Sequence, residues 1–230
     1  MGMVRTALPW VLGALLGAIV LGLPGLYYRY TYEHSKRLRV VTDGKLYRSG
    51  QLSATGFRDA TKRYRIKTVI NLQEDARDPM IPERTFGKPA VNESEVLARL
   101  GVESISLDGG VLEDNPKPGQ RPAVIDEFLE LVDGIREKYW DRGEPHAVLI
   151  HCQAGLHRTG LFTAIYRLEY ENRSLPEVIE ELKANGFGTY AATGANDYIK
   201  RFLLDYQKGQ RRPGGKPAKP GSKPAESGAP

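Results

Sequence analysis

The sequence has little cysteine and little histidine. This scarcity excludes a disulfide-stabilised fold and argues against a metal-binding protein. Cys152 is the single cysteine among 230 residues, so no intramolecular disulfide can form and a disulfide-stabilised fold is excluded. The four histidines are scattered, which argues against a metal site, because such sites need clustered ligands. A lone cysteine is usually an inert core residue, so the neighbours of Cys152 decide what it does.

Basic residues do not dominate the central part of the chain, although the net charge is +5. Residues 41–207 contain 22 basic and 26 acidic side chains, a net charge of −4, whereas residues 1–40 carry +4 and residues 208–230 carry +5. A nucleic-acid-binding domain needs a basic patch on its folded part. The charge distribution therefore argues against a nucleic-acid partner.

Only one long apolar run is present, from Ala7 to Tyr28. As a helix, these 22 residues would rise about 33 Å, enough for a hydrocarbon core of about 30 Å. Trp10 stands near one end and tyrosines near the other, as is typical of membrane interfaces. We expect a transmembrane anchor over residues 7–28, after a short tail of residues 1–6. The alternative is a signal peptide, but the run is long and no small-residue cleavage site follows it.

The segments on either side of the central part differ from it in composition. Residues 29–40 form a basic juxtamembrane linker whose four arginine and lysine residues outnumber Arg5 on the other flank. The positive-inside rule then places the C-terminal domain in the cytoplasm, on a single-pass membrane protein. Residues 208–230 are rich in Pro, Gly and Lys without apolar periodicity, which predicts a disordered basic tail.

Between these ends, predicted strands and helices alternate. Asn92-x-x-Glu95 and Ser174-x-x-Glu177 are capping boxes that each open a helix, the first ending at Gly101 and the second near Gly186. A loop rich in proline and charge is expected from Gln73 to about Val91. We predict strands at 45–49, 67–72, 102–107 and 147–150, and further helices at 53–64, 125–135, 159–171 and 196–206. This alternation predicts one α/β domain over residues 41–207, with a largely parallel central sheet flanked by helices.

The segment after the strand at 147–150 is the one that points to chemistry. It reads His151-Cys152-Gln153-Ala154-Gly155-Leu156-His157-Arg158-Thr159 and leads directly into an amphipathic helix. Unpaired backbone N–H groups at the start of that helix form an anion site, which the helix dipole strengthens. We expect the same field to favour a Cys152 thiolate. Gly155 gives the loop freedom to wrap around a tetrahedral anion, and the guanidinium of Arg158 can bind two phosphate oxygens at once.

This pattern, His-Cys-x5-Arg-Thr after an apolar strand and before a helix, resembles the signature loop of the protein tyrosine phosphatase superfamily, in its dual-specificity branch. The segment Tyr47-Arg48-Ser49-Gly50-Gln51 also resembles smaller, mostly microbial members of that branch. The resemblance implies Cys152 as nucleophile, Arg158 as phosphate clamp, and a hydrogen bond from Thr159 to the Cys152 thiolate. It implies substrate binding by Gln153, Ala154, Gly155, Leu156 and His157, a structural role for His151, and no metal or organic cofactor.

The family's mechanism also needs an aspartate that protonates the leaving alcohol. Asp114, in the sequence Leu112-Glu113-Asp114-Asn115-Pro116, resembles the acid loop of phosphoinositide phosphatases. Asp108, before Gly109-Gly110, resembles the acid loop of a phosphatase associated with cell-cycle kinases. Asp114 lies nearer to Cys152 and fits the usual separation better, so we favour it, and the other aspartate is then a turn residue.

The resemblance leaves the substrate open. The five variable loop positions contain no lysine or arginine, which favours phosphoprotein, chiefly phosphotyrosine, over phosphoinositide or inositol phosphate. A membrane anchor supports the lipid alternative. A non-catalytic phosphate-binding module tethered at the membrane is another alternative, although such proteins typically lose the cysteine or arginine that this chain keeps. A rhodanese-like sulfurtransferase or an arsenate reductase fits less well, since an arsenate reductase needs further cysteines.

Overall fold

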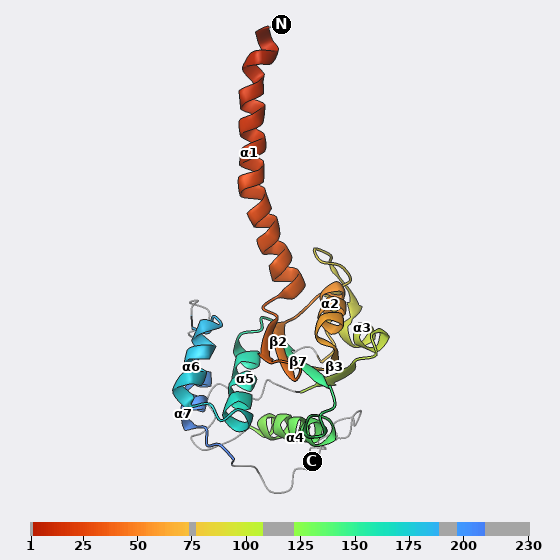
Figure 1. Cartoon of the computed structure of the whole chain (residues 1–230), viewed down its shortest axis with the longest axis vertical. Helices are drawn as coiled ribbons and strands as arrows, with labels where there is room; N and C mark the ends of the chain where they lie inside the picture. The colour runs from red at the N-terminus through yellow and green to blue at the C-terminus, as the bar shows by residue number, and fades with distance from the viewer. Residues whose placement is uncertain (1, 74–76, 108–121, 189–196, 210–230) are drawn as a thin grey trace, which may run out of the picture.

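The computed structural model of the chain describes residues 2–73, 77–107, 122–188 and 197–209, and its helices and strands follow the predicted alternation (Figure 1). In chain order the elements are α1 (Gly2–Tyr30), the π-helical turn η1 (Thr31–Ser35), β1 (Arg39–Thr42), β2 (Leu46–Gly50), α2 (Ala54–Tyr64), β3 (Ile66–Asn71), β4 (Met80–Pro82), β5 (Pro89–Asn92), α3 (Glu93–Arg99), β6 (Glu103–Ser106), α4 (Ala123–Lys138), the 3₁₀ turn η2 (Trp140–Arg142), β7 (Ala147–Cys152), α5 (His157–Tyr170), α6 (Leu175–Ala184) and α7 (Asp197–Asp205).

Five strands form the central sheet, in the order β1-β2-β7-β3-β6. The four strands β2, β7, β3 and β6 are parallel to one another, and β1 pairs antiparallel with β2 at one edge. The prediction of a largely parallel sheet is therefore confirmed. In the register, Gly50 lies opposite Cys152 and Asn71 opposite His151. The carboxyl ends of three parallel strands thus meet at Cys152, the edge where ligands bind in open α/β sheets.

Helices cover both faces of this sheet, because side chains of β7 alternate between two apolar clusters. Val148 and Ile150 pack in a cluster with apolar residues of α4, α5, α6 and α7. Ala147 and Leu149 pack in a second cluster with residues of α2 and α3. This alternation is the period of two that a strand buried on both faces requires. It fixes which way β7 presents its last residue, Cys152.

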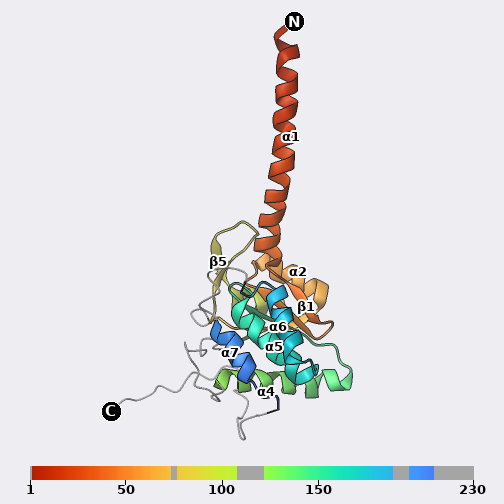
Figure 2. The same ribbon diagram turned by 90° about the vertical axis from the view of Figure 1, so that its left-hand side faces the viewer.

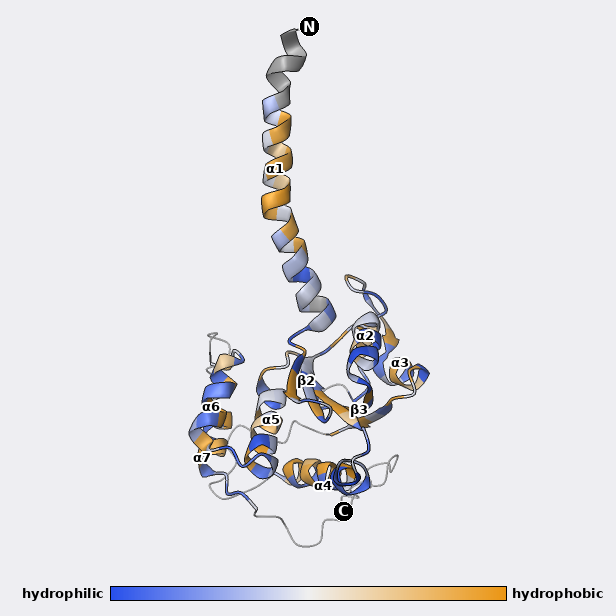
Figure 3. Cartoon of the chain, viewed as in Figure 1, coloured by the Kyte–Doolittle hydropathy of each residue, from blue (hydrophilic) through white to orange (hydrophobic). Residues whose placement is uncertain are grey.

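Helix α1 extends away from the rest of the chain in both views (Figure 1 and Figure 2). It contains the whole predicted span, residues 7–28. Its apolar side chains are exposed, Leu16 and Leu21 among them, and Figure 3 shows the hydrophobic colour along its middle. By length and composition, Pro9–Tyr30 is long and apolar enough to cross a membrane, and a signal sequence has the same properties.

The segment after α1 packs on the α/β domain, a contact that the predicted linker of residues 29–40 did not include. Strand β1 starts at Arg39, before the predicted domain boundary at Val41. The Gly50 amide donates to the Lys36 carbonyl at 2.7 Å. Short pairings of this kind come from contacts with distant residues, so local pattern does not indicate them.

Two other predictions about local structure were wrong. The predicted loop at 73–91 contains a hairpin of β4 and β5. Helix α3 starts where predicted, but Asn92 and Glu95 form no capping box. The Asp78 carboxylate instead accepts hydrogen bonds from the Ser94 amide at 2.9 Å and the Ser94 hydroxyl at 2.7 Å. A carboxylate is a stronger acceptor than the Asn92 amide oxygen, and it also favours the positive end of the helix dipole.

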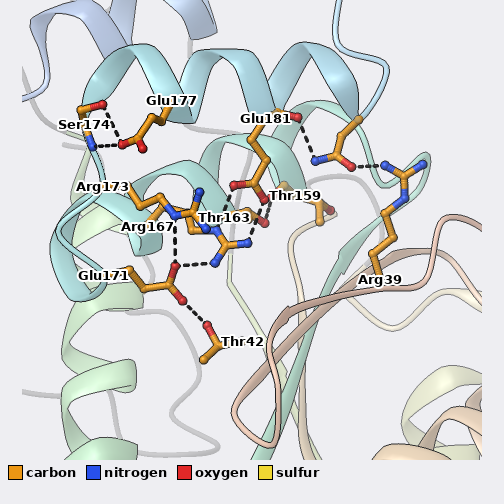
Figure 4. A network of polar contacts seen from close by, with 11 residues as sticks. Arg39, Thr42, Thr159, Thr163, Arg167, Glu171, Arg173, Ser174, Glu177 and Glu181 are labelled. Atoms are coloured by element: carbon orange, nitrogen blue, oxygen red, sulfur yellow. Dashed lines mark hydrogen bonds and ion pairs between the residues drawn. The ribbon is translucent and has the colours of Figure 1, made fainter.

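Helix α5, which follows residues 153–156, is fixed by a polar network that Figure 4 shows. The Arg167 guanidinium makes two hydrogen bonds of 3.0 Å to the Glu181 carboxylate on α6. Arg167 also bonds Glu171, which accepts from Thr42 on β1. At the start of α6, Ser174 and Glu177 form the predicted capping box. The network therefore holds α5 to α6 and to the edge strand.

Candidate active site

The structure brings the predicted loop residues together between the end of β7 and the start of α5. Cys152 is the last residue of β7 and is 4% exposed. Helix α5 begins at His157, two residues earlier than predicted, so Arg158 lies in its first turn. Residues 153–156 connect the two elements, and the Gly155 amide donates to Cys152 Sγ at 3.3 Å. An N–H group aimed at the sulfur stabilises negative charge on it.

Gly155 is required at its position for two reasons. Its φ of +71° lies in the left-handed region that other residues rarely adopt. A Cβ atom there would also lie 2.5 Å from the Gly50 amide nitrogen and 2.7 Å from the Ser49 carbonyl. The loop therefore passes directly against the end of β2, which confirms the predicted need for a glycine.

Backbone amides from neighbouring strands hold two carbonyl groups of the loop. The Leu72 amide donates to the His151 carbonyl at 2.8 Å, and the Gln51 amide donates to the Gln153 carbonyl at 3.1 Å. These donors follow β3 and β2, which flank β7 in the sheet. The loop is thus fixed from both sides.

Two arginines hold the next two carbonyls, and neither was among the predicted site residues. Arg37 Nη1 donates to the Ala154 carbonyl at 3.0 Å, and Arg48 Nη2 donates to the Gly155 carbonyl at 2.9 Å. Burial, followed by the nearby charge of Arg39, lowers the pKa of Arg48 to about 10. Arg48 is therefore charged at neutral pH, and both arginines add positive potential at the loop.

These bonds determine where the loop amides point. In a trans peptide the N–H of one residue points opposite to the C=O of the residue before it, and the described residues contain no cis peptide bond. With the carbonyls of residues 153, 154 and 155 bonded outward, the amides of Ala154, Gly155 and Leu156 face the other way. The Gly155 bond to Cys152 Sγ agrees with this direction. The loop is therefore a cradle whose N–H groups lie on the side away from these donors, with the Gly155 amide on the sulfur, and such a cradle suits an anion.

Arg158 and Thr159 follow the cradle in the first turn of α5. The Arg158 guanidinium is half-buried, and its Nη1 lies 3.5 Å from the Leu72 carbonyl. The Thr159 hydroxyl is buried and has no hydrogen-bond partner among the described residues, so the predicted bond to Cys152 is not formed in this structure. The role predicted for Thr159 remains a prediction.

His157 was predicted to be one of the residues that bind the substrate. It is half-buried, with its ring edge-on to Phe187 at 6.0 Å between centroids. Burial lowers the pKa of His157, and the charges of Arg158 and Arg37 act in the same direction. The imidazole is therefore neutral at neutral pH and adds no positive charge to the loop.

His151 takes part in a buried polar chain beneath the loop. His151 Nε2 lies 2.9 Å from Glu93 Oε1, and both side chains are fully buried. Glu93 also accepts from Gln51, whose side chain accepts from Gln73. Because a carboxylate only accepts, Nε2 carries the proton. This arrangement fits the predicted structural role of His151. Glu93 was missed because nothing in its local sequence indicates a partner 58 residues away.

The two candidate general acids, Asp108 and Asp114, lie outside the described residues. Within the described ranges, no group of three or more His, Cys, Asp and Glu side chains is arranged to hold a metal ion. The structure does bring together the Cys152 sulfur, the Gly155 amide that donates to it, and Arg158 in the first turn of α5.

Comparisons with known proteins agree with this geometry. The sequence profile of the tyrosine phosphatase family matches residues 29–169. The dual specificity protein phosphatase TpbA of Pseudomonas aeruginosa (strain UCBPP-PA14) is 28% identical over 199 residues, which cover 80% of this chain and 76% of TpbA. The crystal structure of P. aeruginosa TpbA has a TM-score of 0.52 at 22% identity, covering 72% of this chain and 84% of that one. The core catalytic domain of the PP-IP phosphatase SIW14 from S. cerevisiae has a TM-score of 0.50 at 20% identity, covering 75% and 86%.

Proposed function

This chain belongs to the tyrosine phosphatase family and is a cysteine-dependent phosphatase, and on that premise we propose that it hydrolyses phosphomonoesters through a cysteinyl-phosphate intermediate formed on Cys152. The observation that carries the proposal is this cradle: the Gly155 amide donates to Cys152 Sγ, while four donors outside the loop hold its carbonyls.

In the first step, the Cys152 thiolate attacks phosphorus, an S–P bond forms and the P–O bond to the leaving alcohol breaks. The loop amides and Arg158 hold the three equatorial oxygens, whose charge they stabilise without rearranging during the reaction. Asp114 donates a proton to the leaving oxygen, so the alcohol departs neutral and Asp114 becomes a carboxylate.

In the second step, water attacks the cysteinyl-phosphate, a P–O bond forms and the S–P bond breaks. Asp114 takes the proton from the water, which restores its acid form, and inorganic phosphate is released. We assign Thr159 to this step. Its hydroxyl is buried without a hydrogen-bond partner among the described residues, so it has a bond to donate to the departing thiolate.

For the substrate we propose phosphotyrosine or another phosphorylated protein side chain. The relative TpbA is named a dual specificity protein phosphatase, and the variable loop positions of this chain contain no lysine or arginine. The second candidate is an inositol phosphate or phosphoinositide. The similar fold of SIW14, which is named a PP-IP phosphatase, supports this candidate. A non-catalytic phosphate-binding module is the remaining alternative, and the presence of both Cys152 and Arg158 argues against it.

We also propose that α1 anchors the enzyme as a single membrane span with the catalytic domain in the cytoplasm. The exposed apolar side chains along α1 (Figure 3) support an apolar environment for it. The basic residues that follow it support the orientation.

The decisive test of the proposed reaction is hydrolysis of p-nitrophenyl phosphate by the full chain in neutral detergent, with a metal chelator present. We expect turnover that the chelator leaves unchanged. A folded protein without turnover that still binds inorganic phosphate would support the phosphate-binding module instead.

Replacing Gly155 with alanine should lower kcat about 100-fold, because the loop must shift and a misplacement of about 1 Å costs about that much. The added Cβ meets the backbone of Gly50 and Ser49. Gly143→Ala is the matched control, since Gly143 has a φ of +73° with nothing within 4 Å of its added Cβ. The thermal unfolding temperatures of both variants are compared. Both variants carry the backbone strain of a positive φ, and only Gly155→Ala also carries the clash. Equal kcat values in the two variants would contradict the close packing of the loop.

Two N-terminal truncations should differ in activity. A chain that begins at Thr31 keeps the bonds from Arg37 to Ala154 and from Gly50 to the Lys36 carbonyl, and we expect near-complete activity. A chain that begins at Val40 loses both bonds and should lose about 1–3 kcal/mol of unfolding free energy and about tenfold in kcat/KM. Chemical unfolding and p-nitrophenyl phosphate kinetics check this. Identical behaviour would mean that residues 31–39 serve only as a linker.

A further inference from the structure

A cleft of about 230 Å³ lies where the end of α1 meets the turn of the β4–β5 hairpin. Both views place the hairpin beside the lower end of α1 (Figure 1 and Figure 2). Arg29 and Lys36 line one wall and Arg84 lines the hairpin wall. The cleft is smaller than the range of about 300–1,000 Å³ for drug-sized ligands, so it suits a single small group.

The charged side chains that line the cleft, among those that the structure describes, are cations. They are Arg29, Lys36 and Arg84. The Arg29 guanidinium lies 4.9 Å from the centre of the Phe86 ring, and the Lys36 ammonium lies 5.7 Å from that of Tyr32. Rings under the cations hold them in place through cation–π attraction. Positive charges that line one cleft favour a bound anion.

Burial lowers the pKa of Lys36, an effect that the Cys152 thiolate opposes and the charge of Arg37 increases. A lysine that loses water on burial gains more from an anion than an exposed one does.

The cleft adjoins the catalytic loop through two of its lining residues, Lys36 and Gln51. Lys36 lines the cleft, and its carbonyl accepts from the Gly50 amide at 2.7 Å, beside the loop. Gln51 also lines the cleft, and its amide donates to the Gln153 carbonyl of the loop at 3.1 Å. The cleft therefore lies close to the loop, on the side from which the loop carbonyls are held.

We propose that this cleft is a second anion-binding site, which takes a phosphate group close to the catalytic loop and is built in part by the end of the membrane-anchor helix. The inference rests on the proposed function, because it assigns the cleft a role beside that reaction. The phosphate can belong to the same soluble substrate or to a lipid headgroup at the membrane surface, where the end of α1 would lie.

The test uses the full chain in neutral detergent, with p-nitrophenyl phosphate as a substrate that carries a single phosphate and inositol hexakisphosphate as the soluble probe. Arg84→Gln should raise the inhibition constant of the probe about tenfold and leave kcat/KM for p-nitrophenyl phosphate within about twofold. Arg99→Gln is the matched control, since Arg99 is an exposed arginine of α3 paired with Glu95. We expect it to change neither value.

A second arm repeats the measurement with the full chain in phosphatidylcholine vesicles with and without phosphatidylinositol bisphosphate. If the lipid inhibits the enzyme and Arg84→Gln weakens that inhibition, the cleft binds lipid headgroups. If Arg84→Gln weakens only the inhibition by the soluble probe, the cleft binds phosphates of soluble substrates. If Arg84→Gln and Arg99→Gln behave alike in both arms, the proposed site is wrong. Absence of p-nitrophenyl phosphate hydrolysis by the unmodified chain contradicts the proposed function instead, and calorimetric binding of the probe then still tests the cleft.

Discussion

Cys152→Ser should lower kcat for p-nitrophenyl phosphate by a factor on the order of 10⁴ to 10⁶, the range seen when an enzyme loses its nucleophile. A serine hydroxyl is protonated at neutral pH and far less nucleophilic than a thiolate. No histidine or carboxylate is bonded to Cys152 among the described residues, since His151 is directed at Glu93. Serine at this position would therefore lack a base to activate it.

The same variant should still bind inorganic phosphate, because the cradle consists of backbone amides and Arg158. Calorimetry with phosphate measures that binding, and turnover with chelator measures the chemistry. Cys152 is the only cysteine, so full inactivation of the unmodified enzyme by iodoacetate should correspond to one labelled thiol per chain. Phosphate should slow this inactivation. Retained turnover in Cys152→Ser would sink the cysteinyl-phosphate mechanism. Loss of both turnover and binding would mean that the loop had collapsed.

The sequence allowed the loop to be located because its determinants are local. A buried strand, a cysteine at its end, a glycine and a helix start occur within 24 residues, and each follows from short-range chemistry. The register that brings Gly50 opposite Cys152 then places the loop at the carboxyl edge of the sheet. The Ser174 capping box was predictable for the same reason, since its two partners are three residues apart.

The supports of the loop were not predictable, because each joins distant parts of the chain. Arg37 lies 117 residues from Ala154, and Arg48 lies 107 residues from Gly155. The resemblance at 47–51 included Arg48 but gave it no role. Strands β1, β4 and β5 have three or four residues each, too few for a period of two to stand out. Asp78 replaced the predicted cap of α3 for the same reason, as its partner is 16 residues away.

Asp114→Asn should lower kcat for a phosphotyrosine peptide by about 10² to 10³, within the range that general acid catalysis contributes. The asparagine cannot donate a proton to the leaving tyrosine oxygen. The loss for p-nitrophenyl phosphate should be much smaller, because the nitro group stabilises the leaving oxyanion and little protonation is needed. Asp108→Asn is the matched control and should lower neither rate by more than about twofold, because Asp108 then takes no part in the proton transfer.

The pH dependence of kcat/KM separates the two aspartates further. The general acid must be protonated in the first step, so the unmodified enzyme loses activity above the pKa of that group, and the Asn variant of the acid should lose this alkaline limb. We expect the limb to vanish in Asp114→Asn and to persist in Asp108→Asn. The reverse result would assign the acid to Asp108. A limb that persists in both variants would show that neither aspartate protonates the leaving group, and that the proton reaches it from another residue or from water.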